Sequence, residues 1–134
     1  AYGEATVPKI TITLRKSYGG SHIVMGCKQL RSDLNFAWPS SEIAVMGASG
    51  AVAILCGKEA KAKKEAGEDV QAFLAEKEDE YTEKFANPYE AASYGYIDDV
   101  IEPRNTRFRI CRGLAQLATK RQQLPAKKHG CMPM

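Results

Sequence analysis

A glycine-rich turn at residues 17–21, with the sequence SYGGS, is the segment of this chain best suited to chemistry. It separates an alternating β-branched run from a run with helical spacing, so we expect it to join a strand to a helix. Glycines at such a junction let backbone N–H groups approach a ligand closely, and a helix N-terminus adds partial positive charge. The turn therefore suits the stabilisation of an oxyanion by the backbone, with a tight turn that binds nothing as the alternative.

Side chains offer less support for catalysis. The two histidines, His22 and His129, have no serine, cysteine or carboxylate partner at a recognisable spacing, so neither a triad nor a zinc site is predicted. Asp98 and Asp99 are neighbours on a predicted strand, and neighbouring strand residues point to opposite faces. We therefore do not expect them to act together as an acid and base pair.

Cysteine spacing predicts neither a metal site nor a disulfide. The separations of 29, 55 and 20 positions are far longer than those of a zinc knuckle or a redox dithiol. The four residues are Cys27, Cys56, Cys111 and Cys131. We expect them to be reduced packing residues of a cytoplasmic protein. The longest uncharged run, residues 43–57, is too rich in glycine, alanine and serine for a membrane span.

Charge is segregated along the chain, although the net charge is only +3. Residues 58–102 carry 6 basic and 13 acidic side chains, whereas residues 103–134 carry 8 basic side chains and no acidic one. A basic block can bind nucleic acid, but this one lacks interleaved aromatic residues and a recognisable nucleic-acid motif. We expect it instead to face an acidic surface of an intact oligomer, and we predict no nucleic-acid partner.

The elements that position the turn follow an α/β pattern within 134 residues, about the size of one domain. A strand over residues 7–14, the glycine turn and a helix over 21–30 form one unit. A strand over 42–46, a second glycine turn at 47–50 and a helix from residue 51 form another. Residues 58–85 are expected to be helical, with a break at Gly67 and a cap at Asp69.

The last part of the chain is expected to contain a strand over residues 96–101 and a final helix that begins at Pro103. Apolar residues recur on one side of that helix at helical spacing. They are Phe108, Cys111, Leu114, Leu117 and Ala118.

Five segments occur in an order that points to a family. They are RKSYGGSHIVM at 15–25, FAWPSSEIAVMGASGAV at 36–52, EKFANPY at 83–89, GYIDDVI at 95–101 and EPRNTR at 102–107. Together they closely resemble the C-terminal part of carboxyltransferase β subunits of biotin-dependent acyl-CoA carboxylases, such as propionyl-CoA carboxylase β chains. The carboxyltransferase subunit of methylmalonyl-CoA decarboxylase is similar. The resemblance implies a crotonase (ClpP)-like α/β fold and places residues 1–134 in the C-terminal carboxyltransferase domain, with the acyl-CoA-binding half outside the chain.

The resemblance also implies a reaction. In the family, carboxybiotin enters between two subunits and releases CO2, and the biotin ureido anion removes the α-proton of the acyl thioester. The resulting enolate captures CO2. No side-chain base is required, because the biotin anion takes the proton, and two oxyanion holes stabilise the developing enolates. The implied activity is carboxyl transfer to a short acyl-CoA such as propionyl-CoA.

A biotin carboxyl carrier protein or domain is the implied partner, and the subunit is implied to form a homo-oligomer. Two alternatives stay open. One is the carboxyltransferase subunit of a methylmalonyl-CoA-type decarboxylase, which runs the chemistry in reverse. The other is a non-catalytic assembly fragment, because an isolated chain without the acyl-CoA site is expected to be inactive.

Matching to the family's motif assigns the oxyanion hole for biotin to the backbone of Gly20 and Ser21, with Gly19 shaping the bend. Ser21 stands where alanine is usual in the family, and the amide donor is retained. His22 stands where a tyrosine is usual, and Ile23 occupies a position that varies with acyl-chain preference. We assign both of these residues to biotin binding.

Trp38, Met46 and Gly47 belong to the next shared motif and are expected to line the biotin pocket. Ordinary packing beneath the turn is the alternative for these three residues. The resemblance implies no metal in this segment.

Overall fold

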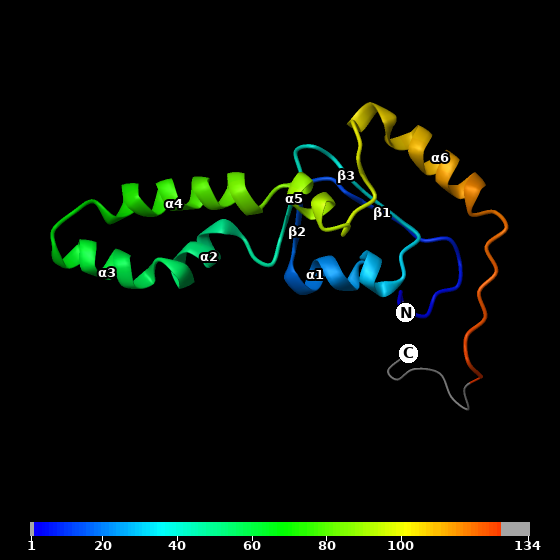
Figure 1. Ribbon diagram of the computed structural model, residues 1–134, viewed down its shortest axis with the longest axis horizontal. Helices are drawn as coiled ribbons and strands as arrows, with labels where there is room; N and C mark the ends of the chain where they lie inside the picture. Colours follow the sequence, from blue (N-terminus) through cyan, green and yellow to red (C-terminus); the bar gives the residue numbers. More distant parts are fainter. Residues whose placement is uncertain (1, 127–134) are drawn as a thin grey trace.

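Two small parallel sheets form the centre of the molecule (Figure 1). The computed structural model describes residues 2–126. Strands β1 (Ile10–Thr13), β3 (Leu34–Ala37) and β5 (Asp99–Val100) pair in the order β1-β3-β5, and β2 (Lys16–Tyr18) pairs with β4 (Glu42–Ala44). Parallel pairing requires crossover connections, which helices supply here, so the α/β prediction is confirmed. Within the described residues, no helix is long and apolar enough to cross a membrane.

The first predicted unit contains one more strand than the sequence indicates. β1 ends at Thr13, the chain bends at Arg15, and β2 then carries it to the glycine turn. The prediction that a single strand over residues 7–14 leads directly into the turn is therefore wrong. β2 has only three residues, and its parallel partner β4 lies more than 20 positions along the chain. Such a long-range pairing leaves no local sequence signature.

The helix predicted over residues 21–30 is divided into two pieces. α1 (Gly19–Val24) begins at the glycines themselves, and a short 3-10 helix, η1 (Lys28–Leu30), follows separately. Gly26 lies between them with a φ of +107°, which cannot continue a right-handed helix. Its carbonyl accepts a hydrogen bond from the Thr11 hydroxyl at 2.7 Å, so this break ties the end of α1 to β1.

Three helices form an arm that projects from the sheets (Figure 1). They are α2 (Ala48–Leu55), α3 (Gly57–Glu65) and α4 (Val70–Phe85), and α4 packs back along α2 and α3. Gly67, with a φ of +75°, lies between α3 and α4. The Asp69 carboxylate accepts hydrogen bonds from the backbone N–H groups of Gln71 and Ala72 at 3.0 and 3.1 Å. The predicted break and cap are therefore both confirmed.

Buried apolar side chains of β3, β4 and α5 (Pro88–Ser93) form the core around the sheets. Asn87 caps α5 by accepting the Glu90 N–H at 2.8 Å, and Pro88 occupies the first turn. The core residues include Phe36, Ala37, Ile43 and Ala91, and Ile97, from the segment between α5 and β5, packs with them.

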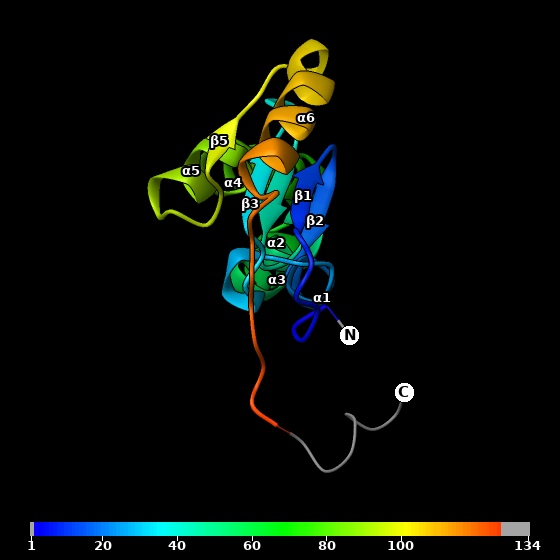
Figure 2. The ribbon, with the colours of Figure 1, turned by 90° about the vertical axis from the view of Figure 1, so that its right-hand side faces the viewer.

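Helix α6 (Thr106–Gln116), preceded by the 3-10 turn η2 (Pro103–Asn105), packs beside β1 and β3 (Figure 2). A Cβ at Gly113 would lie 2.7 Å from Leu34 Cδ1 and 3.1 Å from Ile10 Cδ1, so the missing side chain allows the helix to approach closely. The apolar side predicted from periodicity is largely exposed, with Phe108 at 60% exposure. Helix α6 packs against β1 and β3 through the face that carries Gly113, and the spacing of apolar residues does not predict this face.

Asp33 joins the two ends of the described chain. Its carboxylate accepts the Lys9 N–H at 2.7 Å and the Lys120 ammonium at 2.8 Å, and Lys120 also donates to the Val7 carbonyl at 3.0 Å. Burial raises the pKa of Asp33, but the contacts with Lys120 and Lys9 outweigh it and hold that pKa below its usual value. The segment after α6 is thus fixed beside the start of β1.

Replacing Gly113 with leucine is expected to lower the free energy of unfolding by about 1–3 kcal/mol, because the new side chain overpacks against Leu34 and Ile10. Ala115→Leu, on an exposed position of the same helix, is the matched control and should change it by less than about 0.5 kcal/mol. Urea unfolding followed by circular dichroism measures both. Equal effects of the two variants would contradict the close packing of α6.

Candidate functional site

Two glycine turns lie side by side at one edge of the β2–β4 sheet. The strands are parallel, with Tyr18 opposite Ala44, so both reach their carboxyl ends at this edge. α1 begins directly after β2, and Gly47 is the residue before α2. This is the edge at which ligands of parallel α/β sheets commonly bind, because helix N-termini gather there.

The first turn requires glycine at residue 19. Gly19 has a φ of +51°, which residues with a side chain rarely adopt, and a Cβ at this position would lie 2.8 Å from the Val45 carbonyl oxygen. The turn is therefore pressed against the loop that follows β4.

The amides at the start of α1 are donors without partners inside the helix, because the first N–H groups of any helix lack a preceding carbonyl. Tyr18 precedes α1 and does not cap it with its side chain. The Ser21 hydroxyl donates back to the Tyr18 carbonyl at 2.6 Å. A Cβ placed at Gly20 would meet no atom within 4 Å, so there is open space beside this part of the turn. The arrangement offers backbone N–H groups to an anionic oxygen.

Tyr18 connects the two turns. Its ring lies against Gly47, where a Cβ would be 3.4 Å from Tyr18 Cε2, and its hydroxyl donates to the Glu42 carboxylate at the start of β4. Burial and, after it, the hydrogen bond to Glu42 raise the pKa of Tyr18 to about 12. The phenol is therefore neutral at physiological pH and remains a donor.

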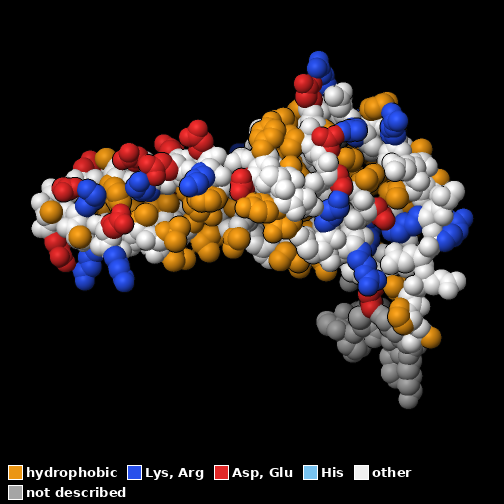
Figure 3. All heavy atoms as spheres, in the orientation of Figure 1, with side chains coloured by type: hydrophobic (Ala, Val, Ile, Leu, Met, Phe, Trp, Pro, Cys, Tyr) orange, Lys and Arg blue, Asp and Glu red, His pale blue; other side chains and the backbone are white. Residues whose placement is uncertain are grey.

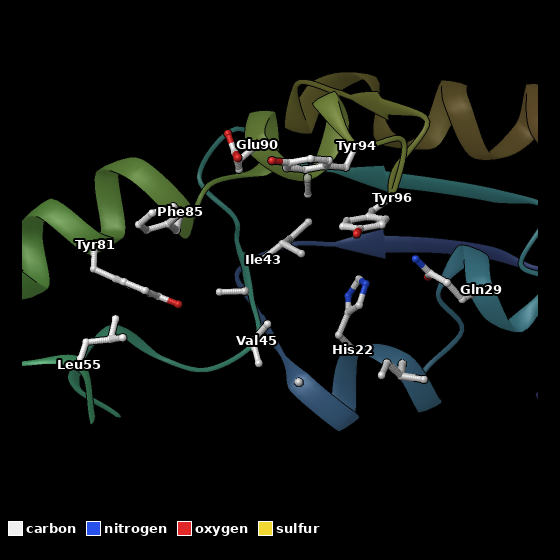
Figure 4. A pocket seen from close by; sticks show the side chains of 14 residues that line it. His22, Gln29, Ile43, Val45, Leu55, Tyr81, Phe85, Glu90, Tyr94 and Tyr96 are labelled. Atoms are coloured by element: carbon white, nitrogen blue, oxygen red, sulfur yellow. The ribbon is translucent and has the colours of Figure 1, made fainter. Parts of the chain in front are cut away.

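A pocket of about 690 Å³ opens beside the first turn (Figure 4). Its walls come from α1, from β4 and the loop after it, from the helical arm, and from α5 and the segment after it. The lining residues are Gly19, His22, Ile23, Gln29, Ile43, Ala44, Val45, Leu55, Tyr81, Phe85, Glu90, Ala91, Tyr94 and Tyr96. Tyr94 and Tyr96 are stacked, with ring centroids 5.8 Å apart. A mostly apolar and aromatic wall with few polar groups suits a small organic ligand.

His22 has a partner that the sequence did not reveal. Ser17 Oγ lies 2.9 Å from His22 Nδ1, so the expectation that His22 lacks a serine partner is wrong. The turn at Gly19 and Gly20 folds α1 back beside β2 and brings the two side chains together. A serine five residues before a histidine, across a glycine pair, is the signal that would have found this contact. Burial lowers the pKa of His22 below its usual value.

The Ser17–His22 pair does not form a nucleophile and its base in this pocket. His22 lines the pocket, but Ser17 does not, so the serine hydroxyl has no access to a ligand there. The hydrogen bond orients the imidazole.

Residues 1–132 match the carboxyl transferase domain family. This chain belongs to that family. Over all 134 residues it is 52% identical to the propionyl-CoA carboxylase beta chain of Saccharopolyspora erythraea, and it covers 24% of that protein. Over 133 residues, 99% of this chain, it is 53% identical to the methylmalonyl-CoA carboxyltransferase 12S subunit of Propionibacterium freudenreichii subsp. shermanii, of which it covers 25%. The chain thus spans about a quarter of these relatives.

A solved structure gives the same family and fold. The transcarboxylase 12S hexamer with methylmalonyl-coenzyme A and methylmalonic acid bound matches with a TM-score of 0.87 and 53% identity. The match covers 99% of this chain and 25% of that one. The resemblance inferred from the five sequence segments and the crotonase-like α/β fold are both confirmed.

The residues of the first turn that the family's motif assigns to biotin differ in their relation to the pocket. Gly19, His22 and Ile23 line the pocket, and Gly20 and Ser21 lie on the same turn. Neither Gly20 nor Ser21 is in the wall of the pocket, so the assignment of their N–H groups to biotin stays a prediction.

The second motif is placed differently. Gly47 lies against the Tyr18 ring at the neighbouring turn, and Met46, 37% exposed, precedes it. Neither residue is in the wall of the pocket. Trp38 lies on another side of the sheet, where its indole N–H donates to Thr106 Oγ1 at 2.9 Å, at the start of α6. Their assignment to biotin stays a prediction.

The two adjacent aspartates contact different partners, but Asp98 precedes the strand, because the strand predicted over residues 96–101 is only β5, Asp99–Val100. Asp98 accepts the Asn35 N–H at 2.8 Å and pairs with Lys28, whereas Asp99 pairs with Arg109. Both are engaged in structural ion pairs. Among residues 2–126, no group of three or more histidine, cysteine, aspartate or glutamate side chains is arranged to hold a metal ion.

Titration of Tyr18 tests the contact between the turns. Because the pKa of Tyr18 is raised to about 12 in the folded protein, the stabilisation it brings is complete below pH 10 and is lost as the pH rises toward 12. The tyrosinate absorbance that disappears in Tyr18→Phe should therefore develop only near the upper end of this range. Glu42→Gln should lower the midpoint part of the way, because burial remains. A Tyr18 signal complete at pH 10 would contradict the contact.

Proposed function

We propose that this chain forms the biotin side of a biotin-dependent acyl-CoA carboxyltransferase. The reaction is transfer of a carboxyl group from carboxybiotin to the α-carbon of a short acyl-CoA such as propionyl-CoA. The observation that carries the proposal is the turn at residues 19–21, which begins α1 without a side-chain cap from Tyr18 and lies beside a largely apolar pocket. The two relatives described above carry names of enzymes that act on propionyl-CoA or methylmalonyl-CoA.

The pocket fits a biotin ring in its chemistry. Leu55, Phe85 and the stacked pair Tyr94 and Tyr96 offer apolar surface to a bicyclic ring, whereas the turn offers hydrogen-bond donors to a polar edge. When bound, biotin supplies the carboxyl group and the base of the reaction, so the protein needs no side-chain base.

This chain's contribution is electrostatic. The N–H groups of Gly20 and Ser21 hold an oxygen that gains negative charge during transfer, and Gly19 fixes their direction through its contact with the Val45 carbonyl. Apolar walls around the turn exclude water, which strengthens these hydrogen bonds. The loss of one such donor typically raises the barrier by about 3–4 kcal/mol. We assign His22 and Ile23, together with Trp38, Met46 and Gly47 of the second motif, to the surroundings of biotin.

The partners follow from the same proposal. A biotin carboxyl carrier protein or domain delivers the carboxyl group, and acyl-CoA binds to a half of the enzyme outside this chain.

Assembly into a homo-oligomer is supported by apolar side chains left exposed along the arm and the body (Figure 3). Val45 is 78% exposed and Ile54 72%. Free thiols at Cys27, Cys56 and Cys111 agree with a cytoplasmic location.

Substitutions at Gly20 test the backbone assignment in the full-length enzyme. Gly20→Pro deletes one N–H donor and should lower carboxyl transfer to free biotin by a factor of about a hundred to a thousand. Proline is tolerated in the first turn of a helix, so the fold should be retained. Gly20→Ala is the matched control, because it keeps the N–H and a Cβ there meets nothing within 4 Å.

Ser21→Ala should also leave transfer nearly unchanged, because the amide is retained. The backbone assignment is wrong if Ser21→Ala abolishes transfer while Gly20→Pro leaves it intact.

The isolated 134-residue chain is expected to show no acyl-CoA-dependent transfer of carboxyl from carboxybiotin, because only one of the two substrate sites is assigned to it. Radiolabelled carboxyl transfer, with the full-length enzyme as a positive control, measures this. Turnover by the isolated chain would show that the acyl-CoA site has been assigned to the wrong part of the enzyme.

A further inference from the structure

His22 is the polar side chain that enters the pocket directly from the glycine turn. Its ring extends from α1 into the cavity toward Tyr96, with Ile43 beside it (Figure 4). Most of the surrounding wall is apolar or aromatic, so the imidazole is one of few groups there that can recognise a polar atom of a ligand. Apart from three tyrosines, the other polar side chains in this wall are those of Gln29 and Glu90.

Ser17 determines how that imidazole is presented. Its hydroxyl lies 2.9 Å from Nδ1, and the two residues are on different elements, β2 and α1, joined by the rigid bend at Gly19. Either atom can donate, depending on the tautomer, and an imidazole nitrogen is a stronger acceptor than a hydroxyl oxygen, so the arrangement favours donation from Ser17 to Nδ1. Nδ1 is then occupied, and the ring proton of the neutral imidazole lies on Nε2.

We infer that His22 donates a hydrogen bond through Nε2 to an oxygen at the polar edge of the ligand in this pocket, with Ser17 as its positioning residue. The inference rests on the proposed function, which makes that ligand the ring of biotin. His22 acts beside the backbone donors of Gly20 and Ser21, since all three belong to the first turn and a half of α1. The backbone donors act on charge that develops during transfer, whereas His22 contributes to binding.

The division of roles sets the kinetic expectation. A group that binds equally in the ground and transition states changes KM and leaves kcat unchanged. A single neutral hydrogen bond contributes about 0.5–1.5 kcal/mol, so its loss should raise KM about two- to twelvefold. His22→Phe, which keeps an aromatic ring and removes the donor, should raise the KM for free biotin by this factor with little change in kcat.

A conservative variant separates hydrogen bonding from packing. His22→Gln places an amide N–H near the position of Nε2 and should restore most of the affinity lost in His22→Phe. Ser17→Ala should raise the KM for biotin less than His22→Phe does, because the donor remains but its orientation is no longer fixed. Ser93→Ala is the matched control, because its hydroxyl bonds only the local Glu90 carbonyl, at 2.8 Å, outside the pocket wall.

Nitrogen NMR of the imidazole provides a readout that is independent of turnover. In the full-length enzyme, His22 should show a single neutral tautomer with the proton on Nε2, and Ser17→Ala should shift it to a mixture of tautomers. A proton on Nδ1 in the wild type would overturn the inference.

The kinetic outcomes also distinguish this inference from the proposed function. An unchanged KM for biotin in His22→Phe, together with lost transfer in Gly20→Pro, would overturn the role of His22 and leave the oxyanion hole intact. Full transfer activity in Gly20→Pro would overturn the oxyanion hole itself.

Discussion

Parallel pairing of β2 with β4 is the constraint on which the site depends. Each strand contributes only three residues, yet the register that places Tyr18 opposite Ala44 brings two glycine turns to one edge. Gly19 then meets the Val45 carbonyl, and Gly47 meets the Tyr18 ring. Moving either strand by one residue would send its side chains to the opposite face and separate the turns. The hydrogen bond from the Tyr18 hydroxyl to the Glu42 carboxylate joins side chains of the two strands and stabilises this register.

The chemistry that such an edge supports is that of the backbone. Amide donors have fixed directions and no pKa in the physiological range, so a turn locked by a positive φ is organised before any ligand arrives. Side chains near the turn have supporting roles: Tyr18 joins the two loops, Ser21 donates back to the turn, and Ser17 orients His22. Under the proposed function, this edge of a carboxyltransferase family member acts through its backbone and needs no catalytic pair of acidic or basic side chains.

The pocket beside the turn is assembled from distant parts of the chain. Leu55, Tyr81 and Phe85 come from the helical arm, whereas Tyr94 and Tyr96 come from the end of α5 and the segment after it. These side chains line the cavity because α4 ends where the arm meets the body and α5 begins close to β4. The position of the arm relative to α5 therefore determines much of the apolar wall.

Local sequence was sufficient for features that local physics controls. The α/β class, the break at Gly67, the cap at Asp69 and the glycine turn before α1 could all be predicted, because each depends on backbone freedom or on hydrogen bonds between near neighbours. The ordered family segments extended this to the fold. Tertiary structure decided what depends on long-range packing: the existence of β2, the exposed face of α6 and the partnership of Ser17 with His22. The tertiary structure also places Trp38 outside the wall of the pocket, where its indole N–H donates to Thr106. Each of these features depends on strand register or on packing between distant segments, and a local sequence pattern predicts neither.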